Sequence, residues 1–305
     1  MHPITLTPPG TVIAPSELIL NSDGSVYHLA LRPEQIGDII FVVGDPGRVE
    51  KISRRFASIE HRVQNREFVA HTGTFNGRRI TALATGIGPD NIDIVLNELD
   101  ALVNIDLATR TPVARPRSLT IVRMGTCGAL QEDIPVDTCV VSHNAIGLDA
   151  LLHFYAHEQT DAELRLLNAF LAHTVWPENL PLPYVSSGDG KLIQALTRDN
   201  HVGITMTAGG FYGPQGRQLR AVPAVPDLNE ALTSFIFPTD GPGPDQRILN
   251  YEMETSALYG LSGLLGHRAC TVCTVVANRL RKEYTKDHHA AVERMIDMVL
   301  ERVAE

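Results

Sequence analysis

The sequence predicts an α/β fold built as a single domain over residues 1–305. A chain of 305 residues with 44% hydrophobic side chains can bury a large core, and this length suits one large domain. Short apolar runs bounded by Gly and Pro alternate with segments of helical period, which is the pattern of a sheet covered by helices. Predicted strands continue at similar spacing on both sides of every proline-rich segment, so we expect no domain linker. Residues 1–24 are expected to form an extended N-terminal arm.

The expected strands are the apolar, β-branched runs 39–44, 79–86, 119–125, 138–147, 202–209 and 270–278. The expected helices are 46–56, 90–104, 162–173, 189–197, 253–265 and 287–303. In the last of these, apolar residues recur at intervals of three and four, as in an amphipathic helix that covers a core. The proline-rich segments 111–118, 176–184 and 222–246 are expected to be loops.

The composition argues against nucleic-acid or membrane partners. The net charge is -9 at pH 7, whereas either partner favours a concentrated basic face. No run approaches the roughly 18–20 apolar residues of a membrane span, and the first ten residues lack the features of a signal peptide. Four cysteines are too few for a disulfide scaffold in so long a chain. We therefore expect a cytoplasmic protein.

No pattern of metal ligands is evident in the sequence. Cys270 and Cys273 form a C-x-x-C pair, but they lie in an apolar run without a second pair, which favours buried strand thiols. His153 and His157 are four residues apart, but their segment lacks the glutamate and third ligand of a zinc enzyme. We expect no metal site.

Two strand-to-helix turns are suited to an anion. GDPGRVEKI, residues 44–52, offers free backbone N–H groups at a helix start, and Arg48 adds a fork-shaped cation that matches phosphate oxygens. TGIGPDNI, residues 85–92, repeats the order of strand, glycine turn and helix. Taken alone, the first motif is also explained by a tight turn with a solvated arginine. Neither motif is a Walker loop or a GxGxxG fingerprint, which argues against ATP or NAD.

A third motif, VRMGTCGAL at residues 122–130, places Arg123 near the end of an apolar strand, followed by a hydroxyl and glycine amides. Ligands of open α/β sheets bind at the carboxyl edge, where this strand ends. An arginine inside an apolar strand needs a partner, and either a bound anion or a structural salt bridge supplies one.

Two later segments carry groups suited to a sugar and a flat ring. In NYEMETSALYG, residues 250–260, Glu252 and Glu254 share a face of an extended segment and suit vicinal sugar hydroxyls, although a solvated helix start is the alternative. Thr255 or Ser256 can begin the following helix. GGFYGPQGRQ, residues 209–218, is either a surface loop or a pocket that stacks on a ring and hydrogen-bonds its edge.

The order of these motifs resembles the nucleoside phosphorylase family with the hexameric-type fold. The matching segments, from residue 25 to the C-terminus, are VYHLAL, GDPGRVEKI, NREF, TGIG, RMGTCG, FYGPQGRQ, YEMETS and NR. The resemblance implies a mixed, twisted, partly barrel-like central sheet flanked by helices. Purine-specific relatives carry a Ser-Asp pattern shortly after the last core strand, where this chain has Ala277 and Asn278. The missing acid favours the uridine-specific branch of the family.

The resemblance also implies roles for the matching residues. Phosphate would be held by Gly44, Arg48, Arg123 and Thr126, with Arg66 reaching in from a neighbouring subunit. Ribose would be bound by Met253 and Glu254, with His28 of the neighbour at the 5′ hydroxyl. The base would contact Phe211, Gln215, Arg217 and Glu252. Arg279 and the segment KEYTKDHH would form or anchor a lid, and the catalytic set would be Arg123, Gln215, Arg217 and Glu254.

The implied reaction is phosphorolysis of uridine to uracil and ribose 1-phosphate, a pentosyl transfer of pyrimidine salvage. It needs no metal or organic cofactor, since phosphate is the co-substrate. A homodimer with shared sites is the minimal unit, and a hexamer is the alternative. A purine phosphorylase, a nucleosidase or a silent nucleoside-binding protein of the same fold would be the competing functions. Departures from the family pattern are Cys127 in place of threonine, the reversed order of Gly213 and Pro214, and the unmatched segment 218–247.

Overall fold

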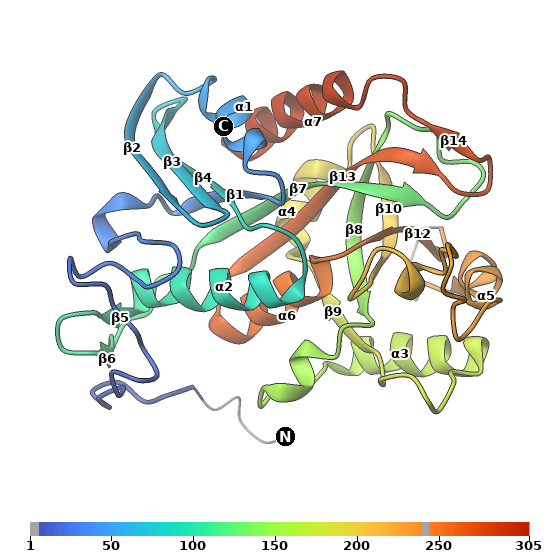
Figure 1. Ribbon diagram of the computed structural model, residues 1–305, viewed down its shortest axis with the longest axis horizontal. Coiled ribbons are helices and arrows are strands. Elements are labelled where there is room, and N and C mark those ends of the chain that lie inside the picture. The colour runs from blue at the N-terminus through green and yellow to red at the C-terminus, as the bar shows by residue number, and fades with distance from the viewer. Residues whose placement is uncertain (1–5, 240–243, 305) are drawn as a thin grey trace.

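A mixed β-sheet runs through the molecule, as seen in a computed structural model that describes residues 6–239 and 244–304 (Figure 1). Its strands are β1 (Ile39–Val43), β2 (Ser58–Asn65), β3 (Phe68–Phe75), β4 (Arg78–Ala84), β7 (Thr120–Ala129), β8 (Cys139–Gly147), β9 (Tyr184–Ser187), β10 (His201–Thr207), β11 (Ile236–Phe237), β12 (Gln246–Glu252), β13 (Arg268–Asn278) and β14 (Glu283–Tyr284). They pair in the order β11-β12-β10-β8-β13-β7-β1-β4-β3-β2, while β9 pairs with β8 and β14 with β13. A separate hairpin joins β5 (Ile105–Asp106) and β6 (Thr111–Pro112).

One end of the sheet closes into a barrel. Strands β12, β10, β8, β13 and β7 follow one another, and β12 then pairs antiparallel with β7 through Asn250 with Ala129 and Tyr251 with Gly128. The expected mixed, partly barrel-like sheet is therefore confirmed. The closure brings the segment after β12 beside the strand that carries Arg123.

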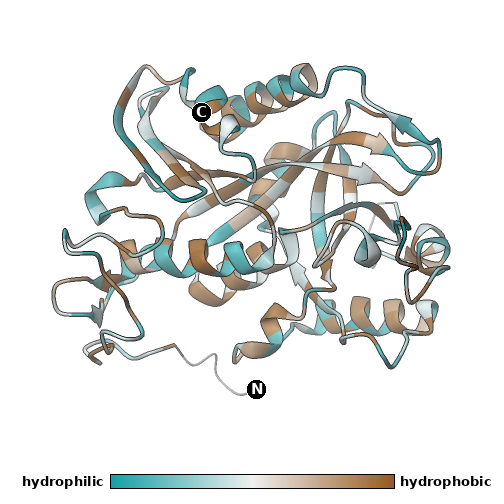
Figure 2. Ribbon diagram, viewed as in Figure 1, coloured by the Kyte–Doolittle hydropathy of each residue, from teal (hydrophilic) through white to brown (hydrophobic). Residues whose placement is uncertain are grey.

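The helices cover both faces of the sheet (Figure 1). They are α1 (Gly47–Ser53), α2 (Pro89–Asn104), α3 (Asp161–Thr174), α4 (Gly190–Thr197), α5 (Leu228–Ser234), α6 (Thr255–Leu265) and α7 (His288–Val303). In β1, Ile40 and Val42 join the core beneath α2 and α6, whereas Phe41 and Val43 join the core beneath α1, α4 and α7. Both faces of this strand are thus buried, which explains its unbroken apolar sequence (Figure 2). No helix in the described ranges is long and apolar enough to cross a bilayer.

All six predicted strands and all six predicted helices are present, with ends that differ by a few residues. The prediction of a loop over 222–246 is wrong in part, because it contains α5 and β11. Leu228, Leu232 and Phe235 are buried at helical spacing there, but a helix of seven residues gives too short a periodic signal. The hairpin of β2 and β3 and the short or edge strands β5, β6, β9, β12 and β14 were also not predicted. The expected loop 111–118 therefore begins with β6, and the expected loop 176–184 ends at the first residue of β9. Of the expected N-terminal arm, residues 1–5 lie outside the described residues.

Two glycines of α6 test the packing of this helix against the short 3-10 helix Leu151–Phe154. A Cβ on Gly260 would overlap Leu152, which is buried, whereas a Cβ on Gly263 would meet no atom within 4 Å. We expect Gly260→Ala to lower the free energy of unfolding by about 1–3 kcal/mol through overpacking. Gly263→Ala is the matched control and should raise it by about 0.5–1 kcal/mol, since alanine favours helix. Equilibrium unfolding in urea measures both, and a Gly260→Ala protein as stable as Gly263→Ala would contradict this packing.

Candidate active site

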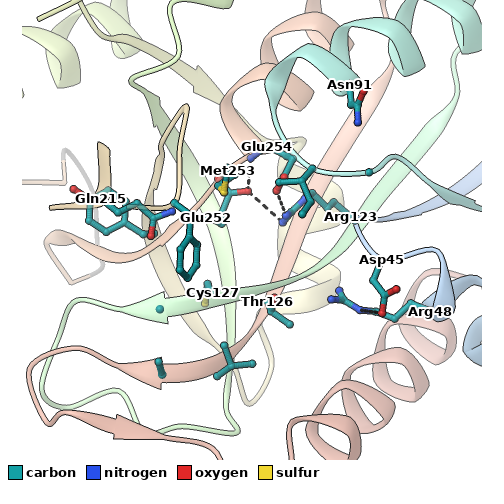
Figure 3. A pocket seen from close by; sticks show the side chains of 18 of the residues that line it. Asp45, Arg48, Asn91, Arg123, Thr126, Cys127, Gln215, Glu252, Met253 and Glu254 are labelled. Carbon is teal, nitrogen blue, oxygen red and sulfur yellow. Dashed lines mark hydrogen bonds and ion pairs between the residues drawn. The ribbon is translucent and has the colours of Figure 1, made fainter. Parts of the chain in front are cut away.

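A pocket of about 870 Å³ opens at the carboxyl ends of the strands (Figure 3). Its walls come from segments that follow β1, β4, β10 and β12, and from the last parts of β7 and β13. This edge is where ligands of α/β sheets bind. Figure 3 shows Arg48 and Asp45 at one end of the pocket and Gln215 at the other, with Arg123, Glu252 and Glu254 between them.

Most of the residues predicted for the site line this one pocket. They are Gly44, Arg48, Arg123, Thr126, Phe211, Gln215, Arg217, Glu252, Met253 and Glu254. Three predicted residues, His28, Arg66 and Arg279, do not line it. The structure thus gathers groups from chain segments far apart, while their individual roles stay predictions.

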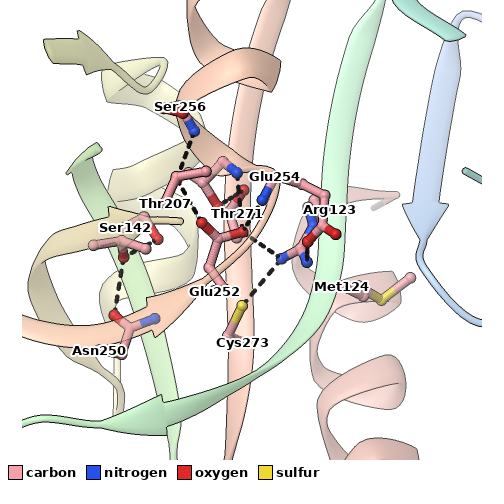
Figure 4. A network of polar contacts seen from close by, with 12 residues as sticks. Arg123, Met124, Ser142, Thr207, Asn250, Glu252, Glu254, Ser256, Thr271 and Cys273 are labelled. Carbon is pink, nitrogen blue, oxygen red and sulfur yellow. Dashed lines mark hydrogen bonds and ion pairs between the residues drawn. The ribbon is translucent and has the colours of Figure 1, made fainter. Parts of the chain in front are cut away.

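Arg123 is at the centre of the polar network (Figure 4). It is 5% exposed, and its guanidinium forms ion pairs with Glu254 and, at 3.2 Å, with Glu252. Its Nη1 also donates to Cys273 Sγ at 3.2 Å. Burial disfavours the charge of Arg123, but the two carboxylates outweigh burial and raise its pKa. The salt bridge considered from the sequence therefore exists, and its partners come from β12 and the residues after it.

Glu252 holds the start of α6 in place. Its Oε2 accepts hydrogen bonds from the backbone N–H groups of Glu254 and Thr255, both at 2.9 Å, and its Oε1 accepts from Thr207 Oγ1 at 2.6 Å. Burial raises the pKa of Glu252, and Arg123 opposes that rise. A carboxylate at a helix N-terminus satisfies N–H groups that lack partners in the helix. Both oxygens of Glu252 are thus engaged by protein groups, and its contact with a base stays a prediction.

Glu254 connects this network to the glycine turn after β4. The backbone N–H of Gly88 donates to Glu254 Oε1 at 2.8 Å, while the other carboxylate oxygen faces Arg123. Gly88 has φ +101°, a conformation that L side chains rarely adopt, and it precedes the first residue of α2. The glycine of the TGIG motif therefore lets the backbone turn toward the carboxylate.

Arg48 supplies a second guanidinium to the pocket. Its Nη1 donates to the carbonyl of Met124 at 3.2 Å, and its Nε lies 3.9 Å from Asp45 Oδ2. Burial lowers the pKa of Arg48, Asp45 raises it, and the nearby charge of Arg123 lowers it further. Two guanidinium groups that repel each other across a pocket favour an anion between them.

The other end of the pocket is formed by the loop after β10. The guanidinium of Arg217 lies over the ring of Phe211, with its Cζ 3.9 Å from the ring centroid, and donates to the Phe211 carbonyl at 2.7 Å. Arg217 also donates to Gln215 Oε1, and Arg279 donates to the Gln215 carbonyl. Burial and then the charge of Arg279 lower the pKa of Arg217. These contacts give the loop one defined shape around a buried amide and a guanidinium.

Several pocket residues were not predicted from the sequence. Tyr251 is 1% exposed, its hydroxyl has no hydrogen-bond partner within the described residues, and burial raises its pKa. Val276 and Ala277 form an apolar part of the wall. Asn278 does not line the pocket, because its amide donates to the carbonyls of Gln131 and Ile134 at 2.9 and 2.7 Å. The only indication in the sequence that Tyr251 belongs to the pocket was its position next to Glu252.

His28 and Arg66 lie beside each other outside the pocket. Arg66 follows β2 with φ +53°, and its Cζ is 5.5 Å from the ring centroid of Tyr27. His28 Nδ1 is 2.7 Å from Glu98 Oε1, and 28% of its side chain is exposed. The next residue after Arg66, Glu67, lines the pocket. This exposed cluster of Tyr27, His28 and Arg66 thus lies at the margin of the site.

No group of three or more His, Cys, Asp or Glu side chains within residues 6–239 and 244–304 is arranged to hold a metal ion. The two thiols of the C-x-x-C pair are fully buried in β13 and are unpaired, as the apolar run predicts.

Comparisons with known proteins find a consistent set of relatives. The family model described as Phosphorylase superfamily matches residues 38–305. A uridine phosphorylase of Thermococcus kodakarensis is 30% identical over 264 residues, which cover 87% of this chain and 81% of the relative. A DeoD-type purine nucleoside phosphorylase of a Geobacillus species is 26% identical over 283 residues, 90% of this chain and 96% of the relative.

The solved structures agree with these sequence matches. A nucleoside phosphorylase of Trypanosoma brucei, described as showing uridine phosphorylase activity, superposes with a TM-score of 0.83 and 30% identity. The match covers 94% of this chain and 99% of that one.

The buried network gives a prediction for stability. Replacing Glu252 by Gln puts an amide, with one acceptor in place of two, opposite Arg123 and two backbone N–H groups. We expect Glu252→Gln to lower the free energy of unfolding by about 3 kcal/mol, because it breaks one of the two ion pairs of buried Arg123 and weakens the hydrogen bonds at the start of α6. Glu230→Gln, which changes an exposed glutamate, is the control and should shift it by less than about 0.5 kcal/mol. Equal urea midpoints for the two variants would show that Glu252 does not support the start of α6.

Proposed function

The chain belongs to the phosphorylase superfamily, and we propose that it cleaves the glycosidic bond of uridine with inorganic phosphate, giving uracil and ribose 1-phosphate. The observation that carries this proposal is the arrangement of one pocket, with the Arg48 guanidinium at one end, Arg123 with two carboxylates in the middle, and an amide with a guanidinium at the other end. The similarity to uridine phosphorylases over most of the chain supports the same substrate. The reaction is a pentosyl transfer that serves pyrimidine salvage.

The chemistry explains why these three groups are needed together. Cleavage of the bond between ribose and base passes through an oxocarbenium-like sugar, while negative charge develops on the leaving base. The enzyme must therefore stabilise charge on the base and hold phosphate close to C1′. No nucleophilic side chain or cofactor is needed for either task, because phosphate itself is the nucleophile.

We assign phosphate to the part of the pocket between Arg48 and Arg123. A phosphate dianion there would relieve the mutual repulsion of the two guanidiniums. The hydroxyl of Thr126 and the turn at Gly44 also line the pocket. Negative charge on the phosphate would also stabilise the cationic sugar in the transition state.

We assign ribose to Glu254 with Met253, and the base to the loop after β10. A carboxylate can accept from both the 2′ and 3′ hydroxyls of ribose. Arg217 offers only hydrogen-bond donors, so it favours the carbonyl of uracil over the amino group of cytosine. The amide of Gln215, next to Arg217, can bind the rest of that edge, and the ring of Phe211 lies beside it.

The absence of an acidic side chain at the end of β13, where the chain has Val276, Ala277 and Asn278, favours a pyrimidine over a purine. Purine-specific relatives are expected to carry an acid near this point. In this chain Asn278 does not line the pocket, and its amide donates to two backbone carbonyls. A purine phosphorylase is the second candidate function, because the chain is also similar to the DeoD-type relative. A nucleosidase would have no use for the arginines at the phosphate end, and a silent binding protein would not need them.

We further propose that two copies of the chain share each site, so that a homodimer is the minimal unit and a hexamer is the alternative. His28 and Arg66 match family motifs but lie outside the pocket of their own chain. They sit on an exposed cluster at its margin, from which they could reach the pocket of a second copy. The four unpaired cysteines suit a reducing compartment, so we place the reaction in the cytoplasm.

The deciding experiment is to incubate the protein with uridine, with and without phosphate, and to measure free uracil and ribose 1-phosphate. We expect release that depends on phosphate. Release without phosphate would indicate a nucleosidase, and turnover of inosine but not uridine would indicate the purine candidate. Binding of uridine without turnover in phosphate would leave only the silent protein.

Arg217 provides a sharper test of the base assignment. We expect Arg217→Ala to lower kcat/KM for uridine by about 100- to 1,000-fold, since a donor to the developing charge is removed. Arg220→Ala is the matched control, because Arg220 is an exposed arginine of the same chain segment that does not line the pocket. Steady-state kinetics with both variants measures the difference, and equal rates would remove Arg217 from the site.

Mixing two inactive variants tests the shared site. Arg48→Ala damages the pocket from within its own chain, and Arg66→Ala is expected to damage the pocket of the partner. Random re-association gives half heterodimers, and each of these has one intact site of two, so about a quarter of the wild-type activity should return. The Arg48→Ala and Arg66→Ala proteins are unfolded and refolded together. If the mixture stays inactive, both arginines belong to the site of the same chain.

A further inference from the structure

A second concave site lies at the opposite edge of the sheet from the active-site pocket. A groove of about 750 Å³ opens where β4, β1, β7 and β13 begin, four neighbouring strands in the sheet (Figure 1). Its charged lining consists of Arg78, Arg79, Arg117, Arg268 and Asp38. The groove uses none of the residues of the proposed reaction, and it has the size of a ligand site.

The register of the sheet explains how these arginines come together. Arg268 pairs with Thr120, Thr120 with Ile39, and Ile39 with Ile80, so the four strand starts form one row. Arg78 and Arg79 directly precede Ile80, and Arg117 precedes Thr120 by three residues. Three chain segments far apart in the sequence therefore place four guanidiniums at a single edge. Strand spacing makes the row roughly 14 Å long.

The positive charge of the groove is only partly compensated. Arg117 pairs with Asp38, and Arg79 pairs with Glu60 at 2.7 Å. Arg268 donates to the neutral hydroxyl of Thr120, and Arg78 has no ion pair in the part of the chain that the structure describes. Two guanidiniums thus lack a carboxylate, in a protein whose net charge is -9. A concave surface concentrates such a charge and attracts anions.

The shape and the remaining lining limit the kind of anion. A single phosphate is too small to meet both ends of a row of this length, whereas a chain of phosphates can lie along it. Arginine forks bind phosphate oxygens in pairs. The lining of the groove also includes the apolar side chains of Ile36, Leu192 and Val303, which a flat ring could contact. We propose that this arginine groove is a binding site for a nucleoside polyphosphate, separate from the active site.

Calorimetric titration of the full-length protein with ATP, without added metal, tests the proposal. ATP is chosen because a purine nucleotide is a poor match for the pyrimidine end of the active site. We expect wild-type protein to bind ATP, and the double variant Arg78→Ala/Arg268→Ala to bind it about tenfold more weakly or worse, because two charge-assisted contacts are lost. Both arginines are exposed, so the double variant should fold and retain its rate with uridine.

Three controls make the result decisive. Arg198→Ala/Arg294→Ala removes the same charge from exposed positions outside the groove and should leave ATP binding unchanged. Arg48→Ala, which alters the active-site pocket, should also leave it unchanged. Equal ATP affinity in wild type and Arg78→Ala/Arg268→Ala would overturn the proposal, and so would loss of binding in Arg48→Ala alone. Inorganic tripolyphosphate that binds as tightly as ATP would overturn the assignment to a nucleotide. None of these outcomes depends on whether uridine is the substrate.

Discussion

The charge of Arg123 is the constraint on which the site depends. A guanidinium that points into a closed sheet is stable only with anionic partners, because removing it from water costs several kcal/mol. Glu252 and Glu254 supply these partners, and they reach Arg123 because β12 closes the barrel against β7. Glu252 also fixes the start of α6, and Glu254 fixes the turn after β4. The strand pairing that closes the barrel therefore also brings together the charged groups of the pocket.

Local signals in the sequence were enough to predict six strands and six helices, and to identify single residues that break the apolar pattern of a strand. Strands buried on both faces read as unbroken apolar runs, and an arginine within such a run, Arg123, is conspicuous for that reason. Its carboxylate partners could not be found in the same way. Glu254 is 131 residues away, and its contact with Arg123 arises only from the pairing of β12 with β7. Segments without a strong period, such as α5 and the hairpin of β2 and β3, were missed for a related reason, since tertiary packing decides them.

The resemblance to a family carried the assignment of roles further than chemistry alone. From the residues themselves, the loop with Phe211 and Arg217 was equally well explained as a surface loop, and the structure shows how both descriptions apply. Phe211 is half exposed, while Gln215 is 3% exposed and bonded to Arg217. Tyr251 had no distinguishing pattern, because burial of its hydroxyl is a property of the closed barrel. His28 and Arg66 lie outside the pocket of their own chain, so their predicted roles require a second copy of the chain.

On the proposed function, the network around Arg123 also connects the binding of the two substrates. Arg123 is bonded to Glu254, and phosphate must share it with that carboxylate. Ribose hydroxyls that donate to Glu254 would satisfy part of its hydrogen-bonding demand and weaken its hold on Arg123. Arg123 would then be freer to bind phosphate, whereas Arg48, whose carboxylate partner Asp45 is exposed and 3.9 Å away, is available from the start. Each substrate would thus improve the site for the other, because both act on one buried ion pair.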